Sequence, residues 1–238
     1  RSTLFPYTTL FRSQPLESKM ADDRKCCLGG AQSAVSENSV DNNFLRARSK
    51  EKNPGLLLHS CCGPCSTSVI ERLAPEYEIT VFYFNPCITD MDEYEKRKEN
   101  QIKFIDAFNR SSMCASKINF IEGRYEPGEY LDLVRGLEDE PEGGARCEVC
   151  FRQRLWETAR RAARLEMPFF TTTLTVSPHK DHGVISRIGN EAAEAYGVKF
   201  LDIDFKKKAG FQRSIQLSKE FGLYRQDYCG CEFSKKNR

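Results

Sequence analysis

Seven of the eleven cysteines stand in three tight groups that lie far apart in the sequence. The groups are Cys61-Cys62-Gly-Pro-Cys65, Cys147-x-x-Cys150 and Cys229-Gly-Cys231. Thiolates gathered in this way are typical of a soft metal site or a redox couple. Because Cys61 and Cys62 follow the apolar run 55–60, we expect them at the end of a strand, in a site that closes when the three groups meet.

Three kinds of chemistry fit this spacing. A zinc site uses four thiolates in a tetrahedron, often from Cys-x-x-Cys pairs, and here it would hold the C-terminal tail. A thioredoxin-like motif would use Cys62-Gly-Pro-Cys65, although Cys61 precedes it and the usual order of elements is absent. An iron–sulfur cluster takes four thiolates, which leaves three for a second iron or a redox pair. Cys87 and Cys114 fall outside the groups and are interpreted as ordinary thiols.

The elements that must position these groups alternate along the chain from Pro54 onward. Short apolar runs predict strands at 55–60, 78–84, 117–121, 168–174 and 198–203. Amphipathic segments predict helices at 65–73, 92–108, 129–137, 147–164, 181–196 and 211–221. This alternation predicts an α/β fold in which about five parallel strands are covered by helices on both faces.

Sites in such sheets form beyond the carboxyl ends of the strands. Cys61 and Cys62 would lie there, and the C-terminal pair could fold back to the same edge. Cys147 and Cys150 open a helix, whose N-terminal dipole would favour their thiolates. His59, inside the apolar run, is expected to be a buried histidine with satisfied ring nitrogens.

Composition restricts the remaining possibilities. The chain has 238 residues, of which 39% are apolar and 29% charged, with a formal charge of +2. No stretch of about 18 apolar residues occurs, so we expect no membrane partner. The odd cysteine count and the length argue against a secreted disulfide framework and favour a reducing, cytoplasmic compartment. Residues 1–53 are expected to be disordered or artefactual, because 1–13 resemble adapter sequence and 20–53 are polar.

Several motifs in order give the chain a specific resemblance. They are Leu-His-Ser-Cys-Cys-Gly-Pro-Cys at 58–65, Tyr-Phe-Asn-Pro-Cys-Ile at 83–88, Tyr-Glu-Lys-Arg at 94–97, Arg-Cys-Glu-Val-Cys-Phe-Arg-Gln-Arg-Leu at 146–155, Thr-Thr-Thr-Leu-Thr-Val-Ser-Pro-His-Lys at 171–180 and Tyr-Cys-Gly-Cys at 228–231. Together they resemble the cobalamin-independent epoxyqueuosine reductase family, QueH, over about residues 54–234.

The resemblance implies both a fold and a function. Members of that family reduce the epoxide of epoxyqueuosine to the alkene of queuosine at the tRNA wobble position, the last step of queuosine biosynthesis. Their fold resembles the alpha-hydrolase-like, PP-loop-like nucleotide-binding domain of tRNA-thiolating enzymes. Because no glycine-rich loop with a P-loop lysine follows the first strand, ATP use is not predicted. The implied catalytic domain covers residues 54–234, with a cysteine-rich C-terminal tail.

The resemblance also implies a four-iron four-sulfur cluster with further thiol chemistry beside it. Cys61, Cys62, Cys147 and Cys150 would bind the cluster. Cys229 and Cys231 would form a redox-active disulfide or bind an adjacent iron, and a Cys-x-Cys disulfide closes a strained, labile ring. Cys65, where some members have Asp, could complete a mononuclear iron site or cap the helix. Tyr228 is a candidate proton donor or a packing residue.

Three further residues are candidates for substrate binding. Asn85 could read a base edge or cap its turn, Lys180 could meet phosphate or lie in solvent, and Arg154 belongs to a basic helix face that could contact tRNA phosphates. The expected partners are tRNA carrying epoxyqueuosine and an unidentified electron donor. Two rival functions stay open, namely a zinc-stabilised RNA-binding module and a sulfur-transfer tRNA-modifying enzyme on the same fold.

Overall fold

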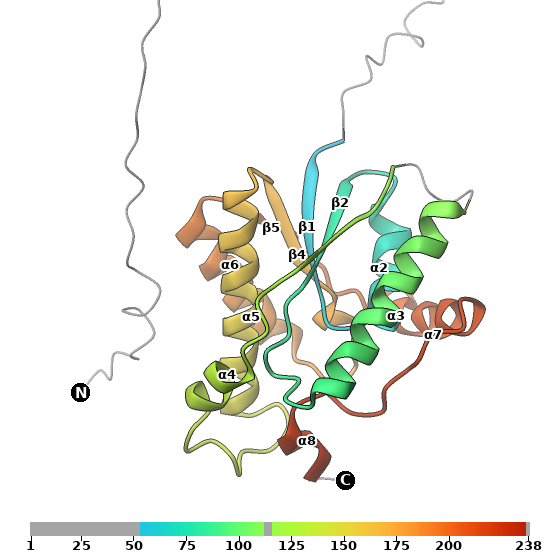
Figure 1. Cartoon of the computed structure of the whole chain (residues 1–238). Coiled ribbons are helices and arrows are strands. Elements are labelled where there is room, and N and C mark those ends of the chain that lie inside the picture. The colour runs from blue at the N-terminus through green and yellow to red at the C-terminus, as the bar shows by residue number, and fades with distance from the viewer. Residues whose placement is uncertain (1–52, 112–115, 237–238) are drawn as a thin grey trace, which may run out of the picture. The chain divides into compact units, whose positions relative to one another are not determined.

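The computed structural model describes residues 53–111 and 116–236. Five strands form one parallel sheet in the order β3-β2-β1-β4-β5 (Figure 1). The strands are β1 (Gly55–Ser60), β2 (Glu78–Tyr83), β3 (Asn119–Glu122), β4 (Phe169–Thr172) and β5 (Lys199–Phe200). The predicted sheet is therefore confirmed. The segment 1–53, apart from Asn53, and Cys114 lie outside the described residues.

Helices cover both faces of the sheet, as the sequence predicts. They are α2 (Gly63–Leu73), α3 (Met91–Arg110), α4 (Pro127–Leu133), α5 (Ala145–Arg164), the 3-10 helix η1 (Thr173–Val176), α6 (His182–Tyr196), α7 (Gly210–Glu220) and α8 (Glu232–Lys236). Figure 1 shows α2, α3 and α7 on one side of the sheet and α5 and α6 on the other. Two of the hydrophobic clusters lie in these two layers.

The central strand β1 supplies both layers. Leu56 and Leu58 pack with residues of α2 and α3, whereas Leu57 points to the opposite face and packs with residues of α5 and α6. All three leucines are fully buried. Because successive side chains of a strand alternate between faces and both faces are covered here, the strand has a continuous apolar sequence. The buried strand ends at Ser60, so Cys61 is the first residue beyond β1.

Strands β4 and β5 are shorter than predicted, for one shared reason. After Thr172 the chain turns into η1, and the Thr172 hydroxyl accepts a hydrogen bond from the Leu174 amide at 3.1 Å. Beyond the short β4–β5 pairing, threonine hydroxyls bond to the backbone of the neighbouring segment. Thr171 donates to the Leu201 carbonyl and Thr175 donates to the Ile203 carbonyl. The turn moves residues 173–180 over the carboxyl end of β1.

The helices differ from prediction mainly at their ends. Asp181 caps α6 by accepting from the Gly183 and Val184 amides, and Gly197 ends it at a φ of 66°. Helix α4 is shorter than expected, and the tail helix α8 was not predicted. Among the described residues, none of the helices is both long and apolar enough to cross a bilayer.

Candidate active site

The first cysteine group lies in the turn between β1 and α2. Cys62 is the N-cap residue of α2, in an extended conformation, and Cys65 lies in the first turn of the helix. The Sγ atoms of Cys61, Cys62 and Cys65 all lie within 4.8 Å of one another. Three sulfur donors this close form a soft set that could hold a metal ion. The sequence therefore placed this group correctly at the end of the first strand.

Hydrogen bonds divide the charge unequally among these three thiols. Bonds from Cys62 and Cys65 hold the pKa of Cys61 well below its usual range, and Lys180 and Arg154 lower it further against the effect of burial. Burial raises the pKa of Cys62 to about 12, with Cys61 adding to the rise. The bonds to Cys61 and Cys62 raise the pKa of Cys65. Of the three, Cys61 is thus the cysteine whose charged form is most favoured, with Lys180 and Arg154 nearby.

Hydrogen bonds between buried polar side chains hold the β1–α2 turn in place. Ser60 donates to the Gln101 amide oxygen at 2.6 Å, and Gln101 donates to the Ser66 hydroxyl at 2.9 Å. Asn85 donates to the Ser60 carbonyl at 2.9 Å. Asn85 is 1% exposed and lines neither of the two pockets at the site. The structure therefore places Asn85 behind the β1–α2 turn, bonded to Ser60, and outside the lining of both pockets.

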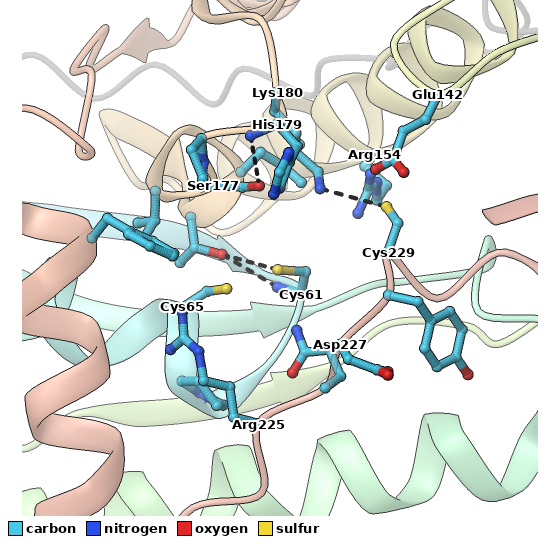
Figure 2. Close-up of a pocket in the computed structure, with 18 residues that line it drawn as sticks. Cys61, Cys65, Glu142, Arg154, Ser177, His179, Lys180, Arg225, Asp227 and Cys229 are labelled. Atoms are coloured by element: carbon cyan, nitrogen blue, oxygen red, sulfur yellow. Dashed lines mark hydrogen bonds between the residues drawn. The ribbon is translucent and has the colours of Figure 1, made fainter. Parts of the chain in front are cut away.

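A pocket of about 260 Å³ opens over Cys61 and Cys65 (Figure 2). Its walls come from the β1–α2 turn, from η1 and the loop after it, and from the segment before Cys229. Three cations line it, Arg154, Lys180 and Arg225. The remaining lining residues are Pro64, Glu142, Thr173, Leu174, Val176, Ser177, Pro178, His179, Phe211, Gln226, Asp227, Tyr228 and Cys229. Tyr228 and Lys180 therefore both line this pocket.

Lys180 connects the pocket to the C-terminal cysteines. Its ammonium donates to the Cys229 Sγ at 3.5 Å, a contact drawn in Figure 2. Burial alone would lower the pKa of Lys180, but Cys229 and Cys61 raise it above its usual value. This lysine is consequently a cation held against sulfur, and the expected alternative of a lysine free in solvent is not what the structure shows.

Arg154 occupies a position that the sequence did not predict. It is 2% exposed, and its guanidinium donates to the Cys150 Sγ at 3.1 Å and to the Cys150 carbonyl at 3.3 Å. Burial lowers the pKa of Arg154, but Cys150 and Cys87 raise it above its usual value. This side chain therefore points inward to Cys150 and into the pocket lining, and not outward from an open helix face.

Other arginines of α5 are engaged in ion pairs on its surface. Arg152 pairs with Glu191 at 2.7 Å and Arg160 with Glu157 at 2.6 Å. Exposed pairs of this kind contribute little to stability, about 0–1 kcal/mol, but they partly neutralise the helix face. The cations that face the pocket come instead from three separate segments, at Arg154, Lys180 and Arg225.

A second cavity of about 20 Å³, large enough for one water, adjoins the first. Five cysteines line it, and they come from three segments: Cys87, Cys147, Cys150, Cys229 and Cys231. Arg154, Lys180, His179, Glu142 and Cys229 line both spaces. All three cysteine groups therefore gather at this edge of the sheet, as expected, with Cys229 between the two cavities.

Cys87 lines this second cavity together with the other four cysteines, contrary to its interpretation as an ordinary thiol. A hydrogen bond from Cys150 lowers the pKa of Cys87 to about 6, and Arg154 adds to the effect, while burial opposes it. The same bond raises the pKa of Cys150. The sequence contained a signal for this position, because Cys87 follows the strand next to β1 and parallel strands end at one edge.

Cys147 lies at the start of a helix, as predicted, and its burial opposes ionisation. Cys147 lies in the first turn of α5 and accepts a hydrogen bond from the Gly143 amide at 3.2 Å. Burial nevertheless raises the pKa of Cys147, since desolvation of the thiolate outweighs this bond.

A buried arginine fixes the C-terminal cysteine pair. Arg97 of α3 is 1% exposed and donates to the Cys229 carbonyl at 3.0 Å, the Tyr228 carbonyl at 3.2 Å and the Glu93 carboxylate at 2.6 Å. Gly230 has a φ of 115°, and a Cβ there would lie 2.9 Å from the Arg97 Nη1. Only glycine fits this position. Cys229 and Cys231 are free thiols in this structure.

His59 is buried and satisfied, as predicted. Its Nδ1 lies 2.8 Å from the Thr172 hydroxyl and its Nε2 lies 3.2 Å from the Phe84 carbonyl. Burial, followed by the charge of Arg154, lowers the pKa of His59 to about 3. The histidine is therefore neutral at pH 7 and joins β1 to β4 and to the residue that follows β2.

This pKa leads to a pH-dependent prediction. Because unfolding returns the pKa of His59 to about 6.5, the unfolded chain binds the extra proton, and stability falls as the pH drops below that value. At pH 5 the loss is about 2 kcal/mol. We expect the difference in unfolding free energy between the metal-free parent and His59→Gln to shrink by this amount from pH 7.5 to pH 5, measured by urea unfolding. A difference that stays constant with pH would contradict the assignment.

Several pocket residues were missed by the sequence analysis. Arg225 and Gln226 lie in a segment without a recognisable pattern, and Phe211 opens the predicted helix 211–221, so only the fold brings these residues to the pocket. Thr173 was within a recognised motif, but its contact was not predicted: its hydroxyl accepts from the Cys61 amide at 3.3 Å and lies 3.6 Å from the Cys61 Sγ.

Comparisons with known proteins show which family the sequence matches. The family model described as epoxyqueuosine reductase QueH matches residues 56–237. The protein named epoxyqueuosine reductase QueH from Streptococcus pyogenes serotype M1 is 43% identical over 183 residues, which cover 77% of this chain and 71% of the relative. The protein of the same name from Thermotoga maritima is 37% identical over 186 residues, covering 77% of this chain and 91% of the relative.

The fold and the site define a thiol-rich α/β protein with a cationic pocket at the carboxyl edge of its sheet. The chain belongs to the epoxyqueuosine reductase QueH family. The resemblance expected from the motifs is therefore confirmed, and the family name is that of an oxidoreductase.

Proposed function

We propose that this chain reduces the epoxide of epoxyqueuosine in tRNA to the alkene of queuosine, the final step of queuosine biosynthesis. The observation that carries the proposal is the family match over the residues that build the pocket, from the β1–α2 turn to Cys231. The reaction breaks both C–O bonds of the epoxide. It consumes two electrons and two protons and releases water, so an electron donor must supply two electrons for each turnover.

The donor set supports a metal cofactor at this site. The three sulfurs of Cys61, Cys62 and Cys65 are mutually close, and soft thiolates are the ligands of iron–sulfur clusters and zinc. We propose that Cys61, Cys62, Cys147 and Cys150 hold a four-iron four-sulfur cluster and that Cys65 binds an adjacent mononuclear iron. When bound, these centres would supply single electrons and a Lewis acid for the epoxide oxygen.

The remaining residues have roles that follow from their positions. Lys180 and Arg154 place positive charge beside the thiols, which offsets the negative charge of thiolates and of a bound anionic substrate. Tyr228 lines the pocket and is the proposed proton donor. Cys229, bonded to Lys180, and Cys231 are the proposed redox pair. We further propose residues 54–234 as the catalytic domain, tRNA as the partner and the cytoplasm as the compartment.

The C-terminal pair yields a separate prediction. Cys229→Ser and Cys231→Ser should each lose turnover while keeping the iron content and visible spectrum of the parent, because the pair transfers electrons without binding the cluster. Iron and sulfide analysis together with a turnover assay provides the measurement. Loss of iron from either variant would instead make these cysteines ligands, and full turnover in both would exclude the redox role.

The function itself is tested on protein purified without oxygen. Metal analysis comes first, and about four irons with sulfide per chain are expected, as one such cluster requires. The protein is then incubated with tRNA containing epoxyqueuosine and dithionite, and nucleosides are quantified by mass spectrometry. Conversion to queuosine is the expected result. Iron-loaded protein that leaves the nucleoside unchanged overturns the proposal, and one zinc with no colour would support the RNA-binding module.

A further inference from the structure

Gln226 connects the pocket to the first cysteine group. It lies in the C-terminal segment between α7 and Cys229, and its neighbours Arg225 and Asp227 are labelled at the pocket in Figure 2. Its side-chain amide Nε2 donates to the Cys62 Sγ at 3.0 Å. Cys62 is fully buried, so water cannot offer this sulfur a replacement donor. The amide is therefore placed to stabilise negative charge on Cys62.

The other half of the same amide lacks a partner. The Gln226 Oε1 is buried and accepts no hydrogen bond from any residue that the structure describes, although Gln226 lines the pocket. A buried carbonyl oxygen left unpaired costs about 1–3 kcal/mol, so such atoms usually meet a partner in the working state. A bound molecule with a hydroxyl or ammonium group would satisfy this oxygen.

We propose that Gln226 is a positioning residue that joins the metal-binding sulfur of Cys62 to the substrate. Its N–H holds the sulfur, and its carbonyl oxygen accepts a hydrogen bond from a hydroxyl of the substrate's cyclopentane ring, next to the epoxide. The inference deepens the proposed function and rests on it for the identity of the substrate. Because both contacts use one rigid amide group, the position of the ring is linked to that of the sulfur.

Two substitutions separate the two contacts. Gln226→Leu removes both the donor and the acceptor, whereas Gln226→Glu removes the donor and keeps an acceptor oxygen at neutral pH. Gln216→Leu, at an exposed position of α7 that lines neither pocket, is the matched control. Unfolding in urea shows whether each variant is folded before it is compared with the parent.

The sulfur contact is tested without substrate, on the metal-loaded proteins. Outer-shell partners of metal ligands typically change metal affinity about 10- to 100-fold. We expect both Gln226 variants to lose metal to a chelator about tenfold faster than the parent, and their midpoint potential to be lower, because an N–H bond to sulfur favours the reduced state. Gln216→Leu should match the parent. An unchanged chelation rate and an unchanged potential in both variants would overturn the proposed contact with the Cys62 sulfur.

The substrate contact is tested by steady-state kinetics on tRNA containing epoxyqueuosine. We expect Gln226→Leu to raise KM about fivefold, equivalent to one hydrogen bond, while Gln226→Glu stays within about twofold of the parent KM. Equal KM values for all variants would overturn the proposed contact with the substrate. If the parent itself shows no turnover, the proposed function fails, whereas the chelation and potential measurements still decide the sulfur contact.

Discussion

Replacing Cys61 or Cys62 by serine is expected to abolish metal binding and, with it, turnover. The two sulfurs lie within 4.8 Å of each other and of Cys65, and both are proposed ligands of the cluster, so either substitution removes a direct ligand. A serine hydroxyl does not ionise near neutral pH and is a poor ligand for soft metals. Since loss of an outer-shell partner already costs about 10- to 100-fold in affinity, loss of a direct ligand should cost more.

The measurement is metal and sulfide content per chain, together with the visible spectrum, after purification without oxygen. Cys26→Ser is the matched control, because Cys26 lies outside the residues 56–237 that the family model covers. It should retain the metal and spectrum of the parent. A Cys61→Ser or Cys62→Ser protein with full metal content and turnover would show that the site is elsewhere.

Arg97→Met is expected to destabilise the fold by about 3–5 kcal/mol, as the loss of one partner from a buried ion pair does. Arg97 is 1% exposed and Glu93 is 9% exposed, and the arginine also holds the carbonyls of Tyr228 and Cys229. Its removal leaves three acceptors without this donor. Turnover should fall as well, because the segment that carries Cys229 and Cys231 loses its attachment to α3.

Urea unfolding and the turnover assay check this expectation. Arg213→Met is the matched control, because Arg213 forms a more exposed pair with Glu71 and should lose no more than about 1 kcal/mol. The double variant Glu93→Leu/Arg97→Met removes both charges and should recover part of the stability without recovering turnover. A stable and fully active Arg97→Met protein would show that the C-terminal segment is held by other contacts.

Local sequence was sufficient for the sheet and for the first cysteine group. The apolar run 55–60 is a strand with the predicted bounds, because both of its faces are buried and every residue must be compatible with the core. Cys61 and Cys62 follow from that, since a residue's place after a strand depends only on where the strand ends. Cys87 could have been placed by the same reasoning, because it follows the neighbouring strand.

The partners of the site residues depended on tertiary structure. The contacts of Arg97 with Cys229, of Gln226 with Cys62 and of Lys180 with Cys229 join positions separated by 132, 164 and 49 residues. The inward direction of Arg154 also follows from packing, because its helix carries arginines on more than one face.

The sequence by itself thus determined the order of the elements, the family and the residues that can do chemistry, because periodicity and motif spacing are local properties. The tertiary structure alone decided which thiols adjoin which cations and which polar side chains face the pocket. The pKa of a thiol depends on burial and on charges within a few ångströms, and in this fold those neighbours come from distant segments.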